Sequence, residues 1–350
     1  MQLLSLSILN DLFDKGKETA LSGRWIRLKE IEPILLNHQK KMEVAQIGFS
    51  EQQRPIYQIK VGIGKKKILI WSQMHGNEST GTKAVFDVLN TVGFESEPSI
   101  EKILTECTLY IIPMLNPDGA EVYTRVNANQ IDLNRDAVDR TAIESKLLRS
   151  ILETVQPDFC FNLHDQRTIF GVEGSHQPAT ISFLAPSEEV TRALTVGRKQ
   201  TMNVIVAMNK VLQQVIPNAV GRYTDEFYPT ATGDTFQKLG YNTILIEAGH
   251  FPNDYEREVT RKYNFWALIQ GIYHIATNDV FEEFEEYFNI PNNIKNFYDV
   301  IHRYPTTKKK DVAFQYEEKI IDNQLVFDLQ KVAQDDLKTY LSHHEIVCDC

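Results

Sequence analysis

The 350-residue sequence contains little cysteine, no long apolar run and fewer basic than acidic residues. Four cysteines are too few for a disulfide scaffold in a chain of this length and fit a reducing compartment. No run approaches the roughly 18 consecutive apolar residues of a membrane-spanning helix, so we expect no membrane partner. The 37 lysines and arginines against 47 aspartates and glutamates give a formal net charge of −10, which disfavours binding to nucleic acid.

The remaining composition is that of an ordinary folded protein. Hydrophobic residues make up 42% and charged residues 24% of the chain, which excludes a disordered or collagen-like protein. The first residues carry no basic segment ahead of their apolar stretch and no small-residue cleavage site after it. We therefore expect no export signal and a cytoplasmic location.

The order of the predicted elements indicates an α/β fold. Apolar residues recur at helical spacing in two segments of the first 43 residues, and short runs of strand character begin at Val44. From there apolar strands alternate with amphipathic helices, among them a long helix from Ser187 to about Ile216, as far as about Thr277. This alternation predicts a mixed, largely parallel sheet with helices on both faces.

We divide the chain into three parts on these patterns. Residues 1–43 are expected to form a helical segment packed on the core, residues 44–279 an α/β domain, and residues 280–350 a small, mixed or β-rich appendage. Within the appendage, two apolar runs flank a polar turn at Asp322 and Asn323, which predicts a β-hairpin.

Polar residues that can carry chemistry follow several predicted strands. His75 and Glu78 follow the strand KKILIWSQM, His164 follows DFCFNL, and Glu247 follows NTILI. Ligands of open parallel sheets bind outside the carboxyl ends of the strands, so these side chains are expected to converge. Two histidines and one carboxylate form a three-ligand site with an open position, the arrangement of catalytic zinc. The alternative is that each histidine is a satisfied core or capping residue.

Six motifs in order resemble those of the zinc carboxypeptidase family of the M14 type. The motifs are HGNES at 75–79, NPDG at 116–119, Arg125, DLNRD at 132–136, NLHD at 162–165 and ILIEAG at 244–249. The resemblance covers roughly residues 47–249. It implies a zinc carboxypeptidase-like fold with the peptidase domain at 44–279, one zinc ion per chain, and a peptide or small amide substrate with a free carboxylate.

The resemblance also implies a role for each matching residue. His75, Glu78 and His164 would hold the zinc ion. Glu247 would be the general base, and Arg125 would polarise the scissile carbonyl.

Asn134 and Arg135 would bind the terminal carboxylate of the substrate, since a guanidinium beside an amide can donate two hydrogen bonds to a carboxylate. The alternative for this pair is a loop salt bridge with Asp132 or Asp136. Many family members have an asparagine where this sequence has Asp136, which adds a negative charge near the pair.

Two residues are candidates for the mobile tyrosine that the family uses. Tyr228, 19 residues before Glu247, is preferred, and Tyr223 is the competing choice. Asp234 falls in the segment that shapes the specificity pocket of related enzymes, where an acid would favour a basic or diamino side chain. Alternatively, Asp234 caps a helix.

Two further alternatives concern the neighbours of the ligands. Asp165 either orients the His164 ring or faces away from it. His250, three residues after Glu247, is a possible competing ligand.

The leading hypothesis is a zinc metallocarboxypeptidase that releases the C-terminal amino acid of a peptide with Glu247 as general base. The first alternative is a zinc amidohydrolase that deacylates small N-acyl amino acids, because related deacylases use a similar His-x-x-Glu and a distant histidine. A second is an inactive module that only binds a carboxylate. The NPDG motif and the Asn134–Arg135 pair favour the peptidase, and the presence of every expected ligand disfavours the inactive module.

Overall fold

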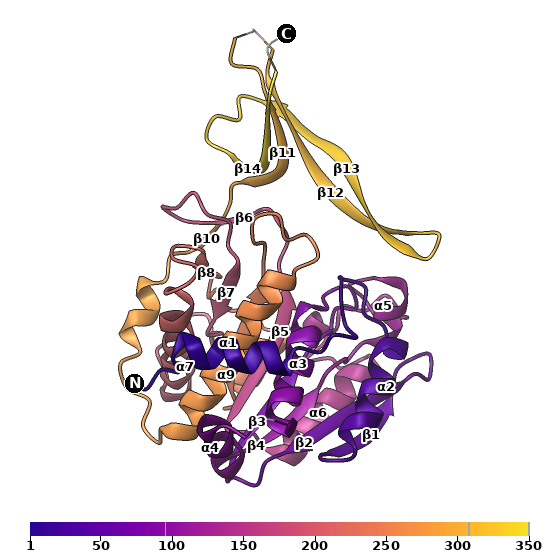
Figure 1. The fold of residues 1–350 in the computed structure, drawn as a ribbon, viewed down its shortest axis with the longest axis vertical. Helices are drawn as coiled ribbons and strands as arrows, with labels where there is room; N and C mark the ends of the chain where they lie inside the picture. The colour runs from indigo at the N-terminus through magenta and orange to yellow at the C-terminus, as the bar shows by residue number, and fades with distance from the viewer. Residues whose placement is uncertain (95, 307–308, 349–350) are drawn as a thin grey trace.

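The computed structural model describes residues 1–94, 96–306 and 309–348 (Figure 1). Its helices are α1 (Leu6–Gly16), α2 (Leu28–His38), α3 (Thr80–Phe94), α4 (Pro98–Glu106), α5 (Pro117–Val122), η1 (Leu133–Arg135), α6 (Ile143–Val155), α7 (Val196–Leu212), α8 (Thr232–Lys238), α9 (Glu258–Thr277) and η2 (Glu285–Asn289). Its strands are β1 (Glu43–Phe49), β2 (Pro55–Val61), β3 (Lys66–Trp71), β4 (Cys107–Ile112), β5 (Phe159–Asp165), β6 (Phe170–Val172), β7 (Ile181–Leu184), β8 (Val220–Arg222), β9 (Asn242–Ala248), β10 (Asn293–Lys295), β11 (Phe297–Arg303), β12 (Asp311–Ile321), β13 (Gln324–Asp335) and β14 (Leu341–Val347). Among the described residues, no helix combines the length and the apolar character needed to cross a bilayer.

The main sheet has eight strands in the order β1-β2-β4-β3-β5-β9-β7-β8. Its central strands β4, β3, β5 and β9 are parallel, whereas β1 and β2 at one edge and β7 near the other pair in antiparallel fashion. The predicted mixed, largely parallel sheet is confirmed. Because the central strands run in one direction, their carboxyl ends lie along one edge, where ligands bind in such sheets.

Helices cover both faces of this sheet because its central strands are apolar on both sides. In β3, Ile68 and Ile70 belong to the cluster formed with α1, α3, α7 and α9. Leu69 and Trp71 point to the opposite face, where they join α6 and α8. There the rings of Trp71 and Phe236 lie 5.4 Å apart. Each fully buried side chain of this size contributes about 1.5–3 kcal/mol.

The prediction of a long helix from Ser187 is wrong for the first third of that segment, because α7 begins only at Val196. The Thr195 hydroxyl caps it by accepting a hydrogen bond from the Arg198 backbone N–H at 3.2 Å. The buried Arg198 side chain donates to the carbonyls of Arg192 at 2.6 Å and Ala185 at 3.3 Å. Residues 187–195 therefore fold around this guanidinium instead of continuing the helix.

The C-terminal residues form a separate sheet in the order β13-β12-β11-β14. Its hairpin turns at Asp322 and Asn323, whose φ angles of 49° and 59° match the left-handed conformation that tight hairpin turns require. The predicted hairpin and the β-rich character of this region are confirmed. Figure 1 shows the sheet beyond the end of the core, with the β12–β13 hairpin reaching back towards α5.

Candidate metal and substrate site

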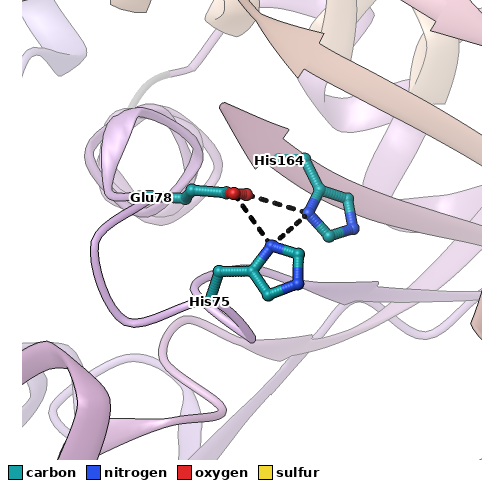
Figure 2. A group of neighbouring side chains, drawn as sticks. All are labelled: His75, Glu78 and His164. Carbon is teal, nitrogen blue, oxygen red and sulfur yellow. Dashed lines mark hydrogen bonds and ion pairs between the residues drawn. The ribbon is translucent and has the colours of Figure 1, made fainter. Parts of the chain in front are cut away.

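Two histidines and a glutamate meet at the carboxyl edge of the main sheet, as Figure 2 shows. His75 follows β3, Glu78 lies two residues before the start of α3, and His164 lies in β5. Glu78 Oε1 lies 2.8 Å from His75 Nδ1, and Glu78 Oε2 lies 2.9 Å from His164 Nδ1. All three side chains are buried, and their ligand atoms lie within 4.8 Å of one another. The structure thus brings together the three predicted ligands.

This set of donors fits a zinc ion. Two imidazole nitrogens and one carboxylate oxygen are ordinary zinc ligands, and three protein ligands leave a fourth position for water or substrate. Both rings turn the same nitrogen, Nδ1, towards the carboxylate, and these two nitrogens are 3.1 Å apart. Burial of a carboxylate costs free energy unless the carboxylate is paired or coordinates a metal. Glu78 is buried beside the two imidazoles, which satisfies this condition.

Asp132 fixes the orientation of the first histidine. His75 Nε2 lies 3.0 Å from Asp132 Oδ1, and Arg125 Nε donates to Asp132 Oδ2 at 3.0 Å. Carboxylates in this place hold a ligating imidazole in the right tautomer and raise its basicity. Sequence reasoning missed this role and considered Asp132 only as a partner for Arg135. Its place in the DLNRD motif was the available signal.

The surroundings of Glu78 and His164 favour the protonation states in which these two residues bind a metal. Burial alone would raise the pKa of Glu78, but His75 and His164 beside it lower that pKa well below its usual range. Burial lowers the pKa of His164, which favours the neutral ring. An ionised carboxylate and a neutral imidazole are the forms that coordinate a metal.

Glu247 lies beside the ligands because of the strand register. In the parallel pair β5–β9, Glu247 is directly opposite His164. Desolvation, followed by the negative charges of Glu78 and Asp165, raises the pKa of Glu247 well above its usual value. A carboxylate with a raised pKa is a more effective proton acceptor near neutral pH.

One cavity of about 380 Å³ is lined by all of the predicted site residues. They are His75, Glu78, Arg125, Asn134, Arg135, His164, Tyr228, Asp234 and Glu247. The volume falls within the usual range for small-molecule sites. Segments far apart in the chain therefore contribute to a single site.

Asn134 and Arg135 line this cavity beside Thr232 and Tyr228. The backbone N–H of Thr232 donates to Asn134 Oδ1 at 3.1 Å, which leaves the Asn134 amide N–H groups to donate to a ligand. The guanidinium of Arg135 stacks on the ring of Tyr228, 4.6 Å from its centroid. This part of the cavity thus presents two side chains whose hydrogen-bond donors are of the kind that bind a carboxylate.

The two aspartates considered as salt-bridge partners of Arg135 are engaged elsewhere. Asp136 Oδ1 accepts hydrogen bonds from the backbone N–H of Thr141 at 2.9 Å and from its hydroxyl at 2.8 Å. Asp136 therefore fixes the turn before α6, and Asp132 contacts His75. Within the described residues, neither carboxylate pairs with Arg135.

Both candidate tyrosines line the cavity, but their surroundings differ. Tyr228 is 53% exposed in the loop before α8. Tyr223 packs edge-on against Phe170 with the ring centroids 5.3 Å apart. Burial, followed by the negative charge of Glu247, raises the pKa of Tyr223, so its phenol keeps its proton.

Asp234 is buried in the wall of the cavity near Tyr228. Its Oδ1 accepts a hydrogen bond from the Tyr228 backbone N–H at 3.1 Å. The N-cap of α8 is Ala231, so Asp234 is not the capping residue that the alternative predicts. Burial raises the pKa of Asp234 to about 6.

The two open questions around the ligands have geometric answers. The Asp165 carboxylate accepts from the Thr80 hydroxyl at 2.7 Å, and the Asp165 backbone N–H donates to Glu78 at 3.1 Å. The backbone of Asp165, and not its side chain, therefore forms a hydrogen bond with one of the three ligand residues. The His250 ring packs 4.1 Å from that of His343 and does not belong to the ligand group.

The amino-acid sequence matches known carboxypeptidases over part of its length. The profile of the zinc carboxypeptidase family matches residues 29–162 and so ends just before His164. Carboxypeptidase SOL1 of Arabidopsis thaliana is 26% identical over 165 residues, which cover 43% of this chain and 33% of that protein. The match therefore spans about a third of that relative's length.

Solved carboxypeptidase structures share the fold. A metallo-carboxypeptidase from Burkholderia cenocepacia is 18% identical, with a TM-score of 0.58, over 71% of this chain and 69% of that chain. Carboxypeptidase A from Helicoverpa armigera is 16% identical, with a TM-score of 0.55, over 77% of this chain and 80% of that chain. The chain is thus similar in sequence to the zinc carboxypeptidase family over residues 29–162 and shares the fold of solved carboxypeptidases.

Proposed function

We propose that this protein is a zinc-dependent metallocarboxypeptidase that hydrolyses the C-terminal amide bond of a peptide. The observation that carries the proposal is the single cavity in which the histidine–glutamate trio, Glu247 and the Asn134–Arg135 pair all lie. The match of the zinc carboxypeptidase profile to residues 29–162 supports it.

The metal end of the cavity suits the hydrolytic step. His75, Glu78 and His164 would hold one zinc ion, which when bound lowers the pKa of a coordinated water to about 7 and polarises a carbonyl. Glu247 takes a proton from the attacking water and later gives it to the leaving nitrogen.

Arg125 supplies a permanent positive charge for the oxygen on which negative charge develops. Its guanidinium reaches the cavity while two carboxylates hold it, Asp132 at 3.0 Å and Glu78 at 3.2 Å. An arginine guanidinium carries a permanent positive charge at physiological pH. Loss of one such donor typically costs about 3 kcal/mol in the barrier.

The other end of the cavity suits the terminal carboxylate of the substrate. Asn134 and Arg135 donate to its two oxygens, and Tyr228, exposed and stacked on Arg135, acts as the mobile tyrosine that covers the bound residue. The buried Asp234 favours a basic or diamino side chain at the released residue. Such a site requires a free C-terminus and so distinguishes a carboxypeptidase from an enzyme that cleaves within a chain.

The test is incubation of the zinc-loaded protein with a mixed peptide library, read by mass spectrometry, with and without a chelator. We expect release of single C-terminal residues, loss of this activity on chelation and its return with added zinc. Cleavage of small N-acyl amino acids alone would support the amidohydrolase instead. Cleavage within chains, or activity that survives full removal of metal, would contradict the proposal.

A further inference from the structure

A second cavity, of about 510 Å³, lies between the core and the β12–β13 hairpin. The hairpin contributes Tyr316, Glu317 and Val332 to its lining, and the core contributes Asn77 and Arg167. It adjoins the first cavity at the metal end, because both are lined by the same five residues there. The shared residues are Glu78, Arg125, Asp165, Gln166 and Arg167.

If the proposed function holds, the positions of the two cavities indicate that the second one also contacts the substrate. Asn134, Arg135 and Tyr228 line only the first cavity. A peptide with its terminal carboxylate at that pair and its scissile bond at the metal ligands therefore extends its acyl part in the other direction. The second cavity lies there, beyond Glu78 and Arg125.

The hairpin is a fixed wall of this cavity. Glu318 in β12 forms an ion pair with the buried Arg24 and accepts a hydrogen bond from the Tyr123 hydroxyl at 2.6 Å. Nearer the base of the hairpin, Gln315 donates to the Thr168 hydroxyl at 2.7 Å. These contacts join strand β12 of the hairpin to the core.

The charges in the lining are balanced with one exception. Each of the four acidic residues in the lining has a cationic partner. The pairs are Glu318 with Arg24, Glu317 with Lys319, Asp165 with Arg257 and Glu78 with Arg125. Arg167 is exposed at the junction of the cavities and forms no ion pair with any other described residue. The lining thus offers one guanidinium whose donors remain for a ligand.

We propose that the second cavity binds the acyl part of the substrate and that Arg167 there binds a carboxylate. A guanidinium matches a carboxylate with two parallel, charge-assisted hydrogen bonds, more specifically than an ammonium does. The substrates preferred by this protein therefore carry an acidic group on the acyl side of the scissile bond. The hairpin wall makes the C-terminal sheet part of the specificity of the enzyme.

The first test compares two peptides that differ only in glutamate or glutamine at the residue before the one released. We expect the wild-type kcat/KM for the glutamate peptide to be about tenfold higher, which corresponds to one charge-assisted contact. Arg167→Ala should remove this preference, and Arg167→Lys should retain part of it. Lys210→Ala, which removes a charge that lines neither cavity, should leave the preference unchanged. Equal rates for the two peptides with the wild-type protein would overturn the inference.

A second variant tests whether the hairpin faces the same part of the substrate. Val332 is 52% exposed on the hairpin wall, so its replacement by a polar residue should not disturb the core. Val332→Glu should lower the preference for the glutamate peptide by repulsion, whereas the neutral control Val332→Gln should not. An unchanged preference in Val332→Glu would contradict the role of the hairpin.

A binding measurement tests this inference independently of the proposed function. Calorimetry with the same two peptides and the Glu247→Gln protein measures recognition without turnover, and the glutamate peptide should bind about tenfold more tightly. Equal affinities, or no binding of either peptide, would overturn the inference even if neutral peptides are cleaved normally. Tighter binding of the glutamate peptide without any C-terminal release would support it and contradict the proposed function.

Discussion

The metal ligands differ from Arg135 and Tyr228, which line another part of the first cavity, in how far their side chains are open to solvent. His75, Glu78 and His164 are 1%, 8% and 2% exposed and contact one another, whereas Tyr228 at the carboxylate-binding end is 53% exposed. Preorganised, buried ligands suit an ion that stays bound, because their side chains are already in position before the ion binds. An exposed ring over Arg135 suits a substrate that enters and leaves. The comparison separates residues that should control metal content from residues that should control only turnover or selectivity.

The largest effect is expected at the metal end. His164→Ala removes one of three ligands, and two ligands hold zinc far more weakly than three. We expect elemental analysis to find about one zinc per chain in the wild-type protein and almost none in this variant, with loss of all hydrolysis.

His176→Ala serves as the matched control, because His176 is exposed and lies outside the ligand group. It should keep its zinc and its activity. Stoichiometric zinc in a folded His164→Ala protein would show that the ion binds elsewhere.

Glu247 should separate metal binding from catalysis. Glu247→Gln preserves size and hydrogen bonding but removes the proton acceptor, so turnover should fall by about 10² or more while the zinc content is retained. Steady-state kinetics and metal analysis of the same preparation measure both. Loss of zinc would make Glu247 a ligand, and normal turnover would assign the base to another residue.

The open end should discriminate by the charge of the peptide terminus. Amidation of the C-terminus removes the charge that Asn134 and Arg135 bind, and kcat/KM should fall by about 10². Arg135→Ala should remove most of the difference between the acid and amide peptides. A peptide acetylated at its N-terminus, with a free carboxylate, should be cleaved like its parent. Equal cleavage of acid and amide by the wild-type protein would rule out this receptor.

The smallest effect is expected at Asp234, through its pKa of about 6, which burial raises above the usual value. Its carboxyl is neutral below that pH and charged above it, so the preference for a C-terminal lysine over a neutral side chain should increase as the pH rises through about 6. We expect about a fivefold change in the ratio of the two kcat/KM values, as for an ion pair of about 1 kcal/mol. Asp234→Asn should make the ratio independent of pH. A flat ratio in the wild-type protein would place the lysine side chain elsewhere.

The main sheet was predictable from sequence because its central strands are apolar on both faces. Every residue of β5 is buried, and the polar residues that follow or end such strands are few enough to stand out as site candidates. The turn at Asp322 and Asn323 was predictable for a similar reason, since few residues tolerate its backbone conformation.

Contacts between distant segments could not be predicted in this way. Asp132 contacts His75 across 57 positions, and Glu318 pairs with Arg24 across 294. Such pairs leave no periodic pattern in the sequence. The error at Ser187 has the same origin, because a buried Arg198 side chain overrides the local helical pattern.

The most direct test of the metal centre is a crystal structure of the zinc-loaded protein with anomalous data collected at the zinc edge. One strong anomalous peak is expected within about 2.0–2.2 Å of His75 Nδ1, His164 Nδ1 and a Glu78 carboxylate oxygen. The peak should lie in the cavity that also contains Glu247 and Arg135. A stoichiometric zinc peak at any other place, or none near these three atoms in fully loaded protein, would contradict the account.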